Sequence, residues 1–232
     1  MNHNDWNKHA AKFESTVCDI VTKETNNQFN KLVRAALKSR KDPVLVDMGC
    51  GVGSFVKKYQ NKFSKIFALD FATRIVLRAK RRCAKIAHAE WFAMDMTRAA
   101  KFFGPRADLT VSLNVVTMGS AKKREAAWKN IHGVTKPKGY ALIVVPSIES
   151  QDVVDELGKE PDERTEGGLV KRDGAWQKFF SAEEFAAAME GNGFKVKKLV
   201  KVHYPWSVEG LRKPRSTTRE PWDWLCLAQR VA

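Results

Sequence analysis

The feature that most constrains the fold is a glycine-rich segment that follows a short apolar run. Residues 44–46 (Val-Leu-Val) are uncharged, as in a strand that a parallel sheet buries on both faces. Asp47 follows, every second residue from 49 to 53 is glycine, and an amphipathic stretch begins at Ser54. Glycine lets the backbone turn tightly and approach a ligand without a Cβ clash. This order of strand, loop and helix predicts a ligand site beyond the carboxyl end of a strand in an open α/β sheet.

Short apolar runs alternate with amphipathic stretches along the rest of the chain, which is the pattern of an α/β fold. The predicted strands cover residues 44–46, 66–70, 91–94, 109–113, 140–145, 194–203 and 224–230. The predicted helices cover residues 9–39, as one or two helices, and 54–60, 73–86, 126–134 and 181–190. Residues 137–139 are predicted to be a turn. The length of 232 residues suits one domain, here residues 41–232, preceded by an N-terminal helical cap over 1–40.

One segment, residues 147–180, breaks this alternation. Residues 147–166 hold eight acids and two basic residues. The glycines at 167–168 and the Asp-Gly pair at 173–174 are turn signals that bracket a short hairpin. Ser181, with Glu184 three residues later, then forms a capping box for the next helix. We therefore expect an insertion that lies over the ligand site as a lid, and not a second domain.

The chemistry of the glycine loop distinguishes between nucleotide-like ligands. In the dinucleotide fingerprint G-x-G-x-x-G/A, the pyrophosphate lies on the helix N-terminus. Here the glycines alternate, the last small position is Ser54, and the carboxylate of Asp47 precedes the first glycine by two residues. That carboxylate would repel a pyrophosphate and would suit an ammonium group. No G-K-[ST] follows, which excludes a P-loop. S-adenosylmethionine, which has an ammonium group and no phosphate, fits best.

Residues 47–53 (Asp-Met-Gly-Cys-Gly-Val-Gly) match the first motif of the class I S-adenosylmethionine-dependent methyltransferases, and the chain resembles that family over about residues 42–200. The resemblance implies a Rossmann-like, seven-stranded, mostly parallel sheet with helices on both faces. It also implies that Asp70 binds the ribose hydroxyls, that Asp95 and Met96 contact the adenine, and that Asn114 lies near the sulfonium. The cofactor-binding residues implied in this way are Asp47, Gly49, Cys50, Gly51, Gly53, Asp70, Phe71, Asp95, Met96 and Asn114.

The reaction implied by the resemblance is an in-line displacement at a methyl carbon already activated by the sulfonium. Positioning of the acceptor then supplies most of the rate effect, and a base is needed only if the acceptor must lose a proton early. His203 and Tyr204 end a predicted strand and are candidates for a catalytic role, although a strand-end histidine can equally be exposed to water. The candidates for walls of an acceptor pocket are Trp6, Trp176, Tyr204 and Trp206.

The chain is strongly basic, with 41 Lys and Arg against 26 acids and a formal net charge of +15. This charge is compatible with RNA as a partner, or with solvated outer helix faces. The region after the fourth predicted strand, 114–117, lacks the Asn-Pro-Pro-Tyr-like sequence that base-modifying members often carry. We therefore expect a small-molecule acceptor with an oxygen, nitrogen or sulfur atom. The alternatives are an RNA (tRNA or rRNA) or protein methyltransferase, and a regulatory protein that binds the cofactor without turnover.

The remaining expectations concern the environment of the protein. Four scattered cysteines fit a reducing cytosol and a cytoplasmic location, and they form no CxxC or zinc-like spacing, so no metal is expected. No apolar run approaches the ~20 residues that span a bilayer, so no membrane partner is expected. A monomer or a homodimer would each suit a chain of this kind.

Overall fold

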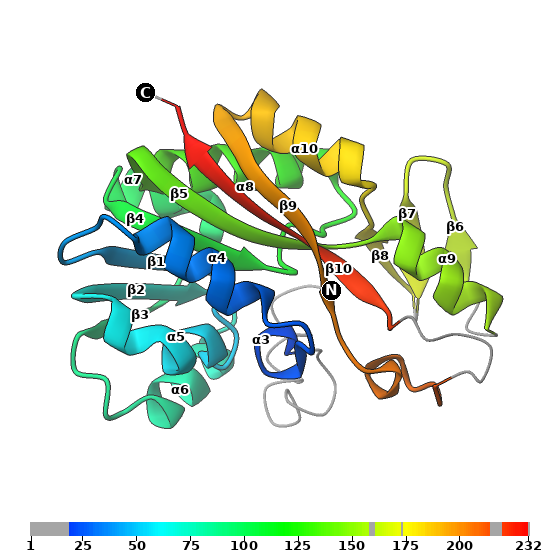
Figure 1. Ribbon diagram of the computed structural model, residues 1–232, viewed down its shortest axis with the longest axis horizontal. Coiled ribbons are helices and arrows are strands. Elements are labelled where there is room, and N and C mark those ends of the chain that lie inside the picture. The colour runs from blue at the N-terminus through cyan, green and yellow to red at the C-terminus, as the bar shows by residue number, and fades with distance from the viewer. Residues whose placement is uncertain (1–18, 158–160, 173, 214–219, 232) are drawn as a thin grey trace.

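The computed structural model describes residues 19–157, 161–172, 174–213 and 220–231. A seven-stranded sheet with the order β3-β2-β1-β4-β5-β10-β9 forms its centre (Figure 1). β10 runs antiparallel to β5 and β9, and the other neighbouring strands are parallel, which confirms the predicted Rossmann-like, mostly parallel sheet. The strands are β1 (Val44–Met48), β2 (Lys65–Asp70), β3 (Ala89–Ala93), β4 (Ala107–Leu113), β5 (Thr135–Pro146), β9 (Phe194–His203) and β10 (Trp222–Arg230).

Helices cover both faces of this sheet, and each face has its own hydrophobic cluster (Figure 1). Alternate side chains of β1 point to opposite faces, so Leu45 belongs to one cluster and Val46 to the other. On the Leu45 face lie α3 (Ile20–Lys23), α4 (Gln28–Leu37) and α5 (Ser54–Tyr59). On the Val46 face lie α7 (Ala99–Phe103), α8 (Ala121–Val134) and α10 (Ala182–Gly191). The remaining helices are α6 (Thr73–Arg82), α9 (Ile148–Glu156) and the short 3₁₀ helices η2 (Gln60–Lys62), η3 (Met96–Arg98) and η4 (Trp206–Glu209).

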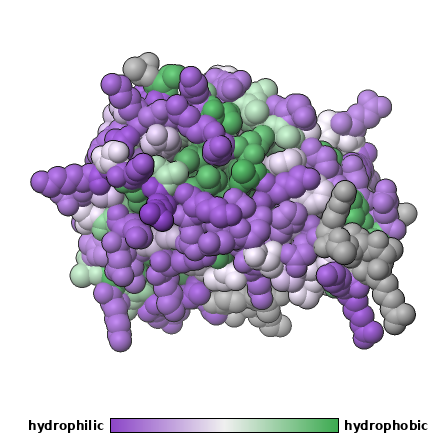
Figure 2. Space-filling view, viewed as in Figure 1, coloured by the Kyte–Doolittle hydropathy of each residue, from purple (hydrophilic) through white to green (hydrophobic). Residues whose placement is uncertain are grey.

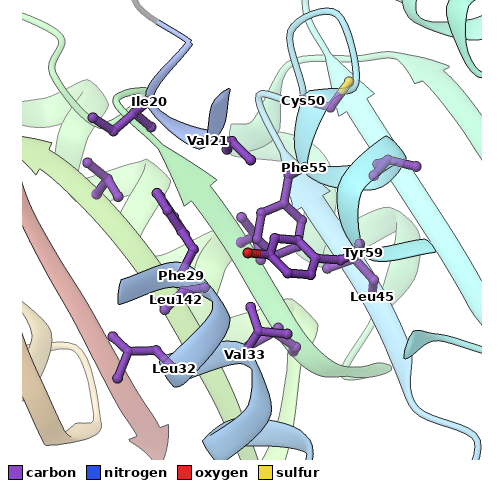
Figure 3. Packing of buried hydrophobic residues seen from close by; sticks show 14 of the residues in the cluster. Ile20, Val21, Phe29, Leu32, Val33, Leu45, Cys50, Phe55, Tyr59 and Leu142 are labelled. Atoms are coloured by element: carbon purple, nitrogen blue, oxygen red, sulfur yellow. The ribbon is translucent and has the colours of Figure 1, made fainter. Parts of the chain in front are cut away.

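The N-terminal helices α3 and α4 pack into the hydrophobic cluster on the Leu45 face of the sheet. Phe29 of α4 meets Phe55 of α5 edge-on, with ring centroids 6.5 Å apart (Figure 3). Ile20 and Val21 of α3 are buried in the same cluster, which also contains Leu45 of β1. Burying large apolar side chains is worth roughly 1.5–3 kcal/mol each. This packing holds α3 beside the first turn of α5, directly after the glycine loop.

The segment 147–180 forms α9 and a small three-stranded sheet, β6 (Glu163–Arg164), β7 (Leu169–Arg172) and β8 (Ala175–Lys178). The structure contains the predicted hairpin as β7 and β8, whereas α9 and β6 were not predicted. β8 is fastened to the connection after β4, because the Lys178 N–H donates to the Thr117 carbonyl at 2.8 Å. Gly119 provides the room for this contact, since a Cβ there would lie 2.8 Å from the Cβ of Trp176.

The turn predicted at residues 137–139 is wrong, because these residues lie inside β5. Lys138 has a left-handed backbone with φ 62°, and the pairing of β4 with β5 shifts register between Ala107 and Leu109. A Cβ on Gly139 would lie 2.9 Å from the Ala107 carbonyl oxygen. The Pro-Lys-Gly signal therefore marks an irregularity within a strand, where glycine permits a close backbone approach.

Candidate functional site

The carboxyl ends of the parallel strands enclose a cavity of about 640 Å³. It opens where β1 is flanked by β2 on one side and β4 on the other, which is the topological switch point at which open α/β sheets bind ligands. Of the ten predicted cofactor residues, Gly53 does not line the cavity. Those that line it are Asp47, Gly49, Cys50, Gly51, Asp70, Phe71, Asp95, Met96 and Asn114.

The glycine loop has a fixed backbone path. The N–H groups of Gly49 and Cys50 both donate to the Leu69 carbonyl, at 2.8 and 2.9 Å. Gly49, Gly51 and Gly53 all have positive φ angles, of 84°, 52° and 79°. Such angles strain residues that carry a Cβ, so each glycine is required by its backbone conformation.

Two of these glycines also make room for protein side chains. A Cβ on Gly49 would lie 2.3 Å from Val115, and a Cβ on Gly53 would lie 2.8 Å from Trp91 of β3. We expected Gly49 to make room for the ligand, but the space beside it is filled by Val115. Gly53 allows close packing between the start of α5 and β3, which explains why it lies outside the cavity.

Asp70 ends β2 and orders the loop beside it. Its Oδ2 accepts from the Gly51 N–H at 3.2 Å, and its Oδ1 accepts from the Ala72 N–H at 2.9 Å. Burial raises the pKa of Asp70, and the backbone hydrogen bonds oppose that rise. The carboxylate is thus held in one orientation at the edge of the cavity, where it can accept hydrogen bonds from hydroxyl groups of a ligand.

Asp47 is the most unusual acid of the site. It is 2% exposed, and its Oδ2 is buried without a hydrogen-bond partner. Burial, and then the charge of Asp70, raises the pKa of Asp47 to about 8. A buried acceptor without a partner costs roughly 1–3 kcal/mol, a cost that a ligand with N–H donors would remove. An ammonium group beside Asp47 and ribose hydroxyls beside Asp70 match the amino-acid end and the central sugar of S-adenosylmethionine, so the residues present fit this cofactor.

The third strand contributes Asp95 and Met96. The Oδ1 of Asp95 accepts from the Thr97 N–H at 2.9 Å and caps the 3₁₀ helix that follows. Met96 is buried, whereas Phe71, which follows β2, is 36% exposed at the cavity. Asp95, Met96 and Phe71 thus all line the cavity, and a carboxylate with apolar side chains in one cavity suits a planar base with an exocyclic amine.

The candidate acceptor residues differ in whether they line the cavity. Trp176 lines the cavity from β8, together with Lys122 and Lys123 at the start of α8. The cavity is not lined by His203, Tyr204 or Trp206. His203 ends β9, which lies four strands from β1 in the sheet, a separation of about 19 Å at the usual strand spacing. Trp6 lies outside the described residues.

A row of polar contacts that the sequence did not reveal joins α3 to the site. The Ser54 hydroxyl donates to Asp19, and Arg82 Nη1 donates to the same hydroxyl at 2.7 Å. Asp19, Ile20 and Val21 consequently line the cavity.

Asp223 of β10 is a further residue that the sequence analysis did not single out, and its Oδ2 accepts from Asn114 Nδ2 at 2.6 Å. Its signal in the sequence is an acid between Trp222 and Trp224, at the start of a run that is otherwise apolar up to residue 228.

Two kinds of feature are absent from the described residues. No described helix has both the length and the apolar character of a bilayer-spanning segment. Within the same residues, His, Cys, Asp and Glu side chains form no group of three or more that could hold a metal ion.

Comparison with known proteins gives two kinds of match. The methyltransferase domain family matches residues 45–139. No curated protein matches the sequence of this chain. Among solved structures, 1,6-didemethyltoxoflavin-N1-methyltransferase from Burkholderia thailandensis, with bound 1,6-didemethyltoxoflavin and S-adenosylhomocysteine, is 14% identical with a TM-score of 0.70, and the match covers 99% of this chain and 87% of that one.

Two further structures have the same fold. The N-methyltransferase NodS from Bradyrhizobium japonicum is 15% identical with a TM-score of 0.61, over 89% of this chain and 96% of that one. Magnesium protoporphyrin IX methyltransferase from Synechocystis, with bound S-adenosylhomocysteine, is 14% identical with a TM-score of 0.62, over 87% of this chain and 81% of that one. At these identities the likeness concerns the fold. Residues 45–139 match the methyltransferase domain family, the fold is that of the class I methyltransferases, and the chain is an S-adenosylmethionine-dependent methyltransferase.

Proposed function

We propose that this enzyme transfers a methyl group to an oxygen, nitrogen or sulfur atom of a small molecule. The observation that carries the proposal is the size of the cavity. Its volume of about 640 Å³ lies within the roughly 300–1,000 Å³ of small-molecule and cofactor pockets. Trp176 of the hairpin and Ile20 of α3 both line it. An acceptor must therefore fit between these elements together with the cofactor.

Within this proposal, the nine predicted residues that line the cavity hold the cofactor. Asp47 receives the ammonium group, the backbone of residues 49–51 supports the amino-acid end, and Asp70 binds the ribose. Asp95, Met96 and Phe71 surround the adenine. The acceptor then occupies the end formed by Thr117, Met118, Ser120, Lys122, Lys123 and Trp176.

The chemistry needs little from the protein beyond orientation. When bound, S-adenosylmethionine supplies an electrophilic methyl group. The acceptor's lone pair forms the new bond to the methyl carbon, the electron pair of the broken carbon–sulfur bond stays on sulfur, and any acceptor proton leaves to water. Trp176 and the loop after β4 hold the acceptor atom in line, and α3 excludes water from that side. In the proposed division of the chain, α3 belongs to the N-terminal cap and the hairpin to the lid.

An RNA acceptor is the second candidate, and α6 is the feature that favours it. This helix carries five basic residues and no acid, and it begins three residues after Asp70. Figure 2 shows a face on which hydrophilic residues predominate around an apolar patch, and this face does not separate the two candidates. The small-molecule methyltransferases among the similar structures support the first candidate.

A labelling screen tests the proposal. Purified enzyme is incubated with methyl-labelled S-adenosylmethionine and either a metabolite extract or a total RNA pool, and the products are analysed by mass spectrometry. We expect label in a metabolite and none above background in RNA. Label in RNA, with RNA affinity that falls steeply with salt, would favour the second candidate. Cofactor binding without label in either pool would indicate a regulatory protein.

A further inference from the structure

The acceptor end of the cavity carries two positive charges. Lys122 and Lys123, the second and third residues of α8, both line the cavity there, together with Trp176 of β8. The described acids that line the cavity lie instead at the start of α3 and at or just after the ends of β1, β2 and β3; they are Asp19, Asp47, Asp70 and Asp95. The charges of the two ends of the cavity are therefore opposite in sign.

The stability of α8 does not account for the two lysines. The first turn of an α-helix is the positive end of its dipole, where acids are favourable and bases are not. Two other described helices with a serine N-cap, α9 and α10, follow this rule, with Glu149 in one first turn and Glu183 and Glu184 in the other. α8 has the same kind of cap, Ser120, but no acid in its first turn. Two adjacent positive charges at this place oppose the helix that carries them.

Contacts with other protein groups do not account for the lysines either. The next residue, Arg124, has a structural use, because its Nη1 donates to two backbone carbonyls of the connection after β4. Glu125, three residues after Lys122, pairs instead with Lys129, at 2.6 Å. Over the described part of the chain, neither Lys122 nor Lys123 forms an ion pair. Both charges are available to a ligand.

We propose that the methyl acceptor is an organic anion whose carboxylate or phosphate group binds Lys122 and Lys123. This inference rests on the proposed function and narrows its substrate class. Each ammonium group offers a positive charge and three N–H donors, and charged oxygens form the stronger hydrogen bonds with such donors. Both lysines are exposed, so the anionic group lies at the solvent-facing end of the cavity. The nucleophilic atom of the acceptor then lies further in, beside the methyl donor.

Two other anions compete for the lysines. One is the backbone of an RNA, but the five basic residues of α6 do not line the cavity and so do not extend the pair into the row of charges that a nucleic acid needs. The other is the carboxylate of the cofactor itself, which the proposed arrangement places at the glycine loop. The experiments below separate both from the acceptor.

Anion-exchange fractionation of a metabolite extract is the first test. The extract is divided at pH 8 into retained anions and unretained compounds, and each fraction is incubated with the enzyme and methyl-labelled S-adenosylmethionine. We expect label in a compound of the retained fraction. Phosphatase treatment before the incubation should abolish this label if the anion is a phosphate ester and leave it if the anion is a carboxylate. Label in the unretained fraction alone would overturn the inference.

The second test removes both charges with Lys122→Gln and Lys123→Gln. At a limiting amount of the retained fraction, this double variant should be slower by at least on the order of tenfold, the usual effect of losing a hydrogen bond between charged groups. Its Kd for S-adenosylhomocysteine should stay within about twofold. Its thermal transition should not fall, since the helix dipole favours fewer positive charges there. The matched control is Lys197→Gln with Lys198→Gln, an adjacent exposed pair in β9 that does not line the cavity, and it should leave the rate unchanged.

Four results of the second test would contradict the inference. They are an unchanged rate in the α8 variant, a lower thermal transition of that variant, an equal loss of rate in the β9 control, and a rise in the Kd for S-adenosylhomocysteine that matches the loss of rate. The last would assign the lysines to the cofactor carboxylate. Failure of the proposed function has a different signature, because the wild-type enzyme would then label neither metabolite fraction, or would label RNA.

Discussion

Two buried carboxyl groups at the same edge of the sheet, Asp47 and Asp223, differ in how their oxygens are used. Asp223 has a partner for its carboxyl in Asn114, Ser147 and Tyr204. Asp47 keeps Oδ2 buried without a partner. Native structures rarely tolerate such an atom unless a ligand satisfies it. At the residue scale, Asp47 is therefore a group that lowers the stability of the free protein in return for ligand binding.

The pH dependence of stability follows from the raised pKa of Asp47, about 8 against 3.8 for the ordinary group. As pH rises from about 4 through 8, the unfolded chain releases this proton while the folded chain keeps it, so the free energy of unfolding falls. Asp47→Asn should remove this loss. Without cofactor, the variant should be more stable than wild type by on the order of 2–5 kcal/mol at pH 9, and the difference should vanish near pH 4.

Urea unfolding between pH 4 and pH 9 measures this difference, with Asp42→Asn in an exposed loop as the control that leaves the profile unchanged. The Asp47→Asn variant should also bind S-adenosylmethionine more weakly. A stability difference that does not grow with pH would show that Asp47 is not a buried protonated acid in the free enzyme.

At the scale of elements, local patterns predicted best those parts whose surroundings are uniform. β9 was predicted with its observed limits, Phe194–His203, and the capping box of α10 forms both of its hydrogen bonds. The expectation for residues 147–180 was an insertion with a hairpin, and it did not include α9. Two acids of this helix, Asp152 and Asp155, pair with Arg164 of β6, and a local pattern does not contain such contacts. The prediction started the last strand at Trp224 because Asp223 interrupts the apolar run, whereas β10 begins at Trp222.

The site shows the same division between local and non-local information. The candidate cofactor residues that line the cavity lie at or just after the ends of β1, β2, β3 and β4. Their proximity was predictable because the carboxyl ends of parallel strands meet at one edge of a sheet. His203 and Tyr204 also end a strand, but the order of strands, which no local pattern contains, places β9 at the far edge of the sheet. Asp223 was missed because β10 runs in the opposite direction, so its first residues, and not its last, reach the cavity edge.

The hairpin β7–β8 gives a prediction at this scale. Trp176→Ala should raise KM for the acceptor on the order of tenfold, because the lost apolar contact is worth roughly 1.5–3 kcal/mol. The Kd for S-adenosylmethionine should change by less than about twofold, since in the proposed arrangement Trp176 contacts the acceptor and not the cofactor. Gln177→Ala, at the next position of β8, is the matched control and should leave both constants unchanged. Equal changes in KM and cofactor Kd would mean that the hairpin does not separate the two ends.

At the scale of the whole molecule, the net charge of +15 is distributed over a surface that also carries local ion pairs. In the insertion, Asp152 and Asp155 pair with Arg164, and Glu163 pairs with Lys171. Three acids of this segment are therefore paired within the insertion itself. Lys122 and Lys123, in contrast, line the cavity beside the acceptor end. The overall charge thus favours anionic ligands at the mouth of the site.

The central claim is that the cavity at the carboxyl edge of β1, β2 and β4 holds the methyl donor. A crystal structure of the enzyme grown with S-adenosylhomocysteine tests it most directly. The account predicts density with the ammonium group beside Asp47, the ribose hydroxyls on Asp70 and the sulfur facing Asn114. Density for the ligand elsewhere, or a cavity without it at saturating concentration, would contradict the account.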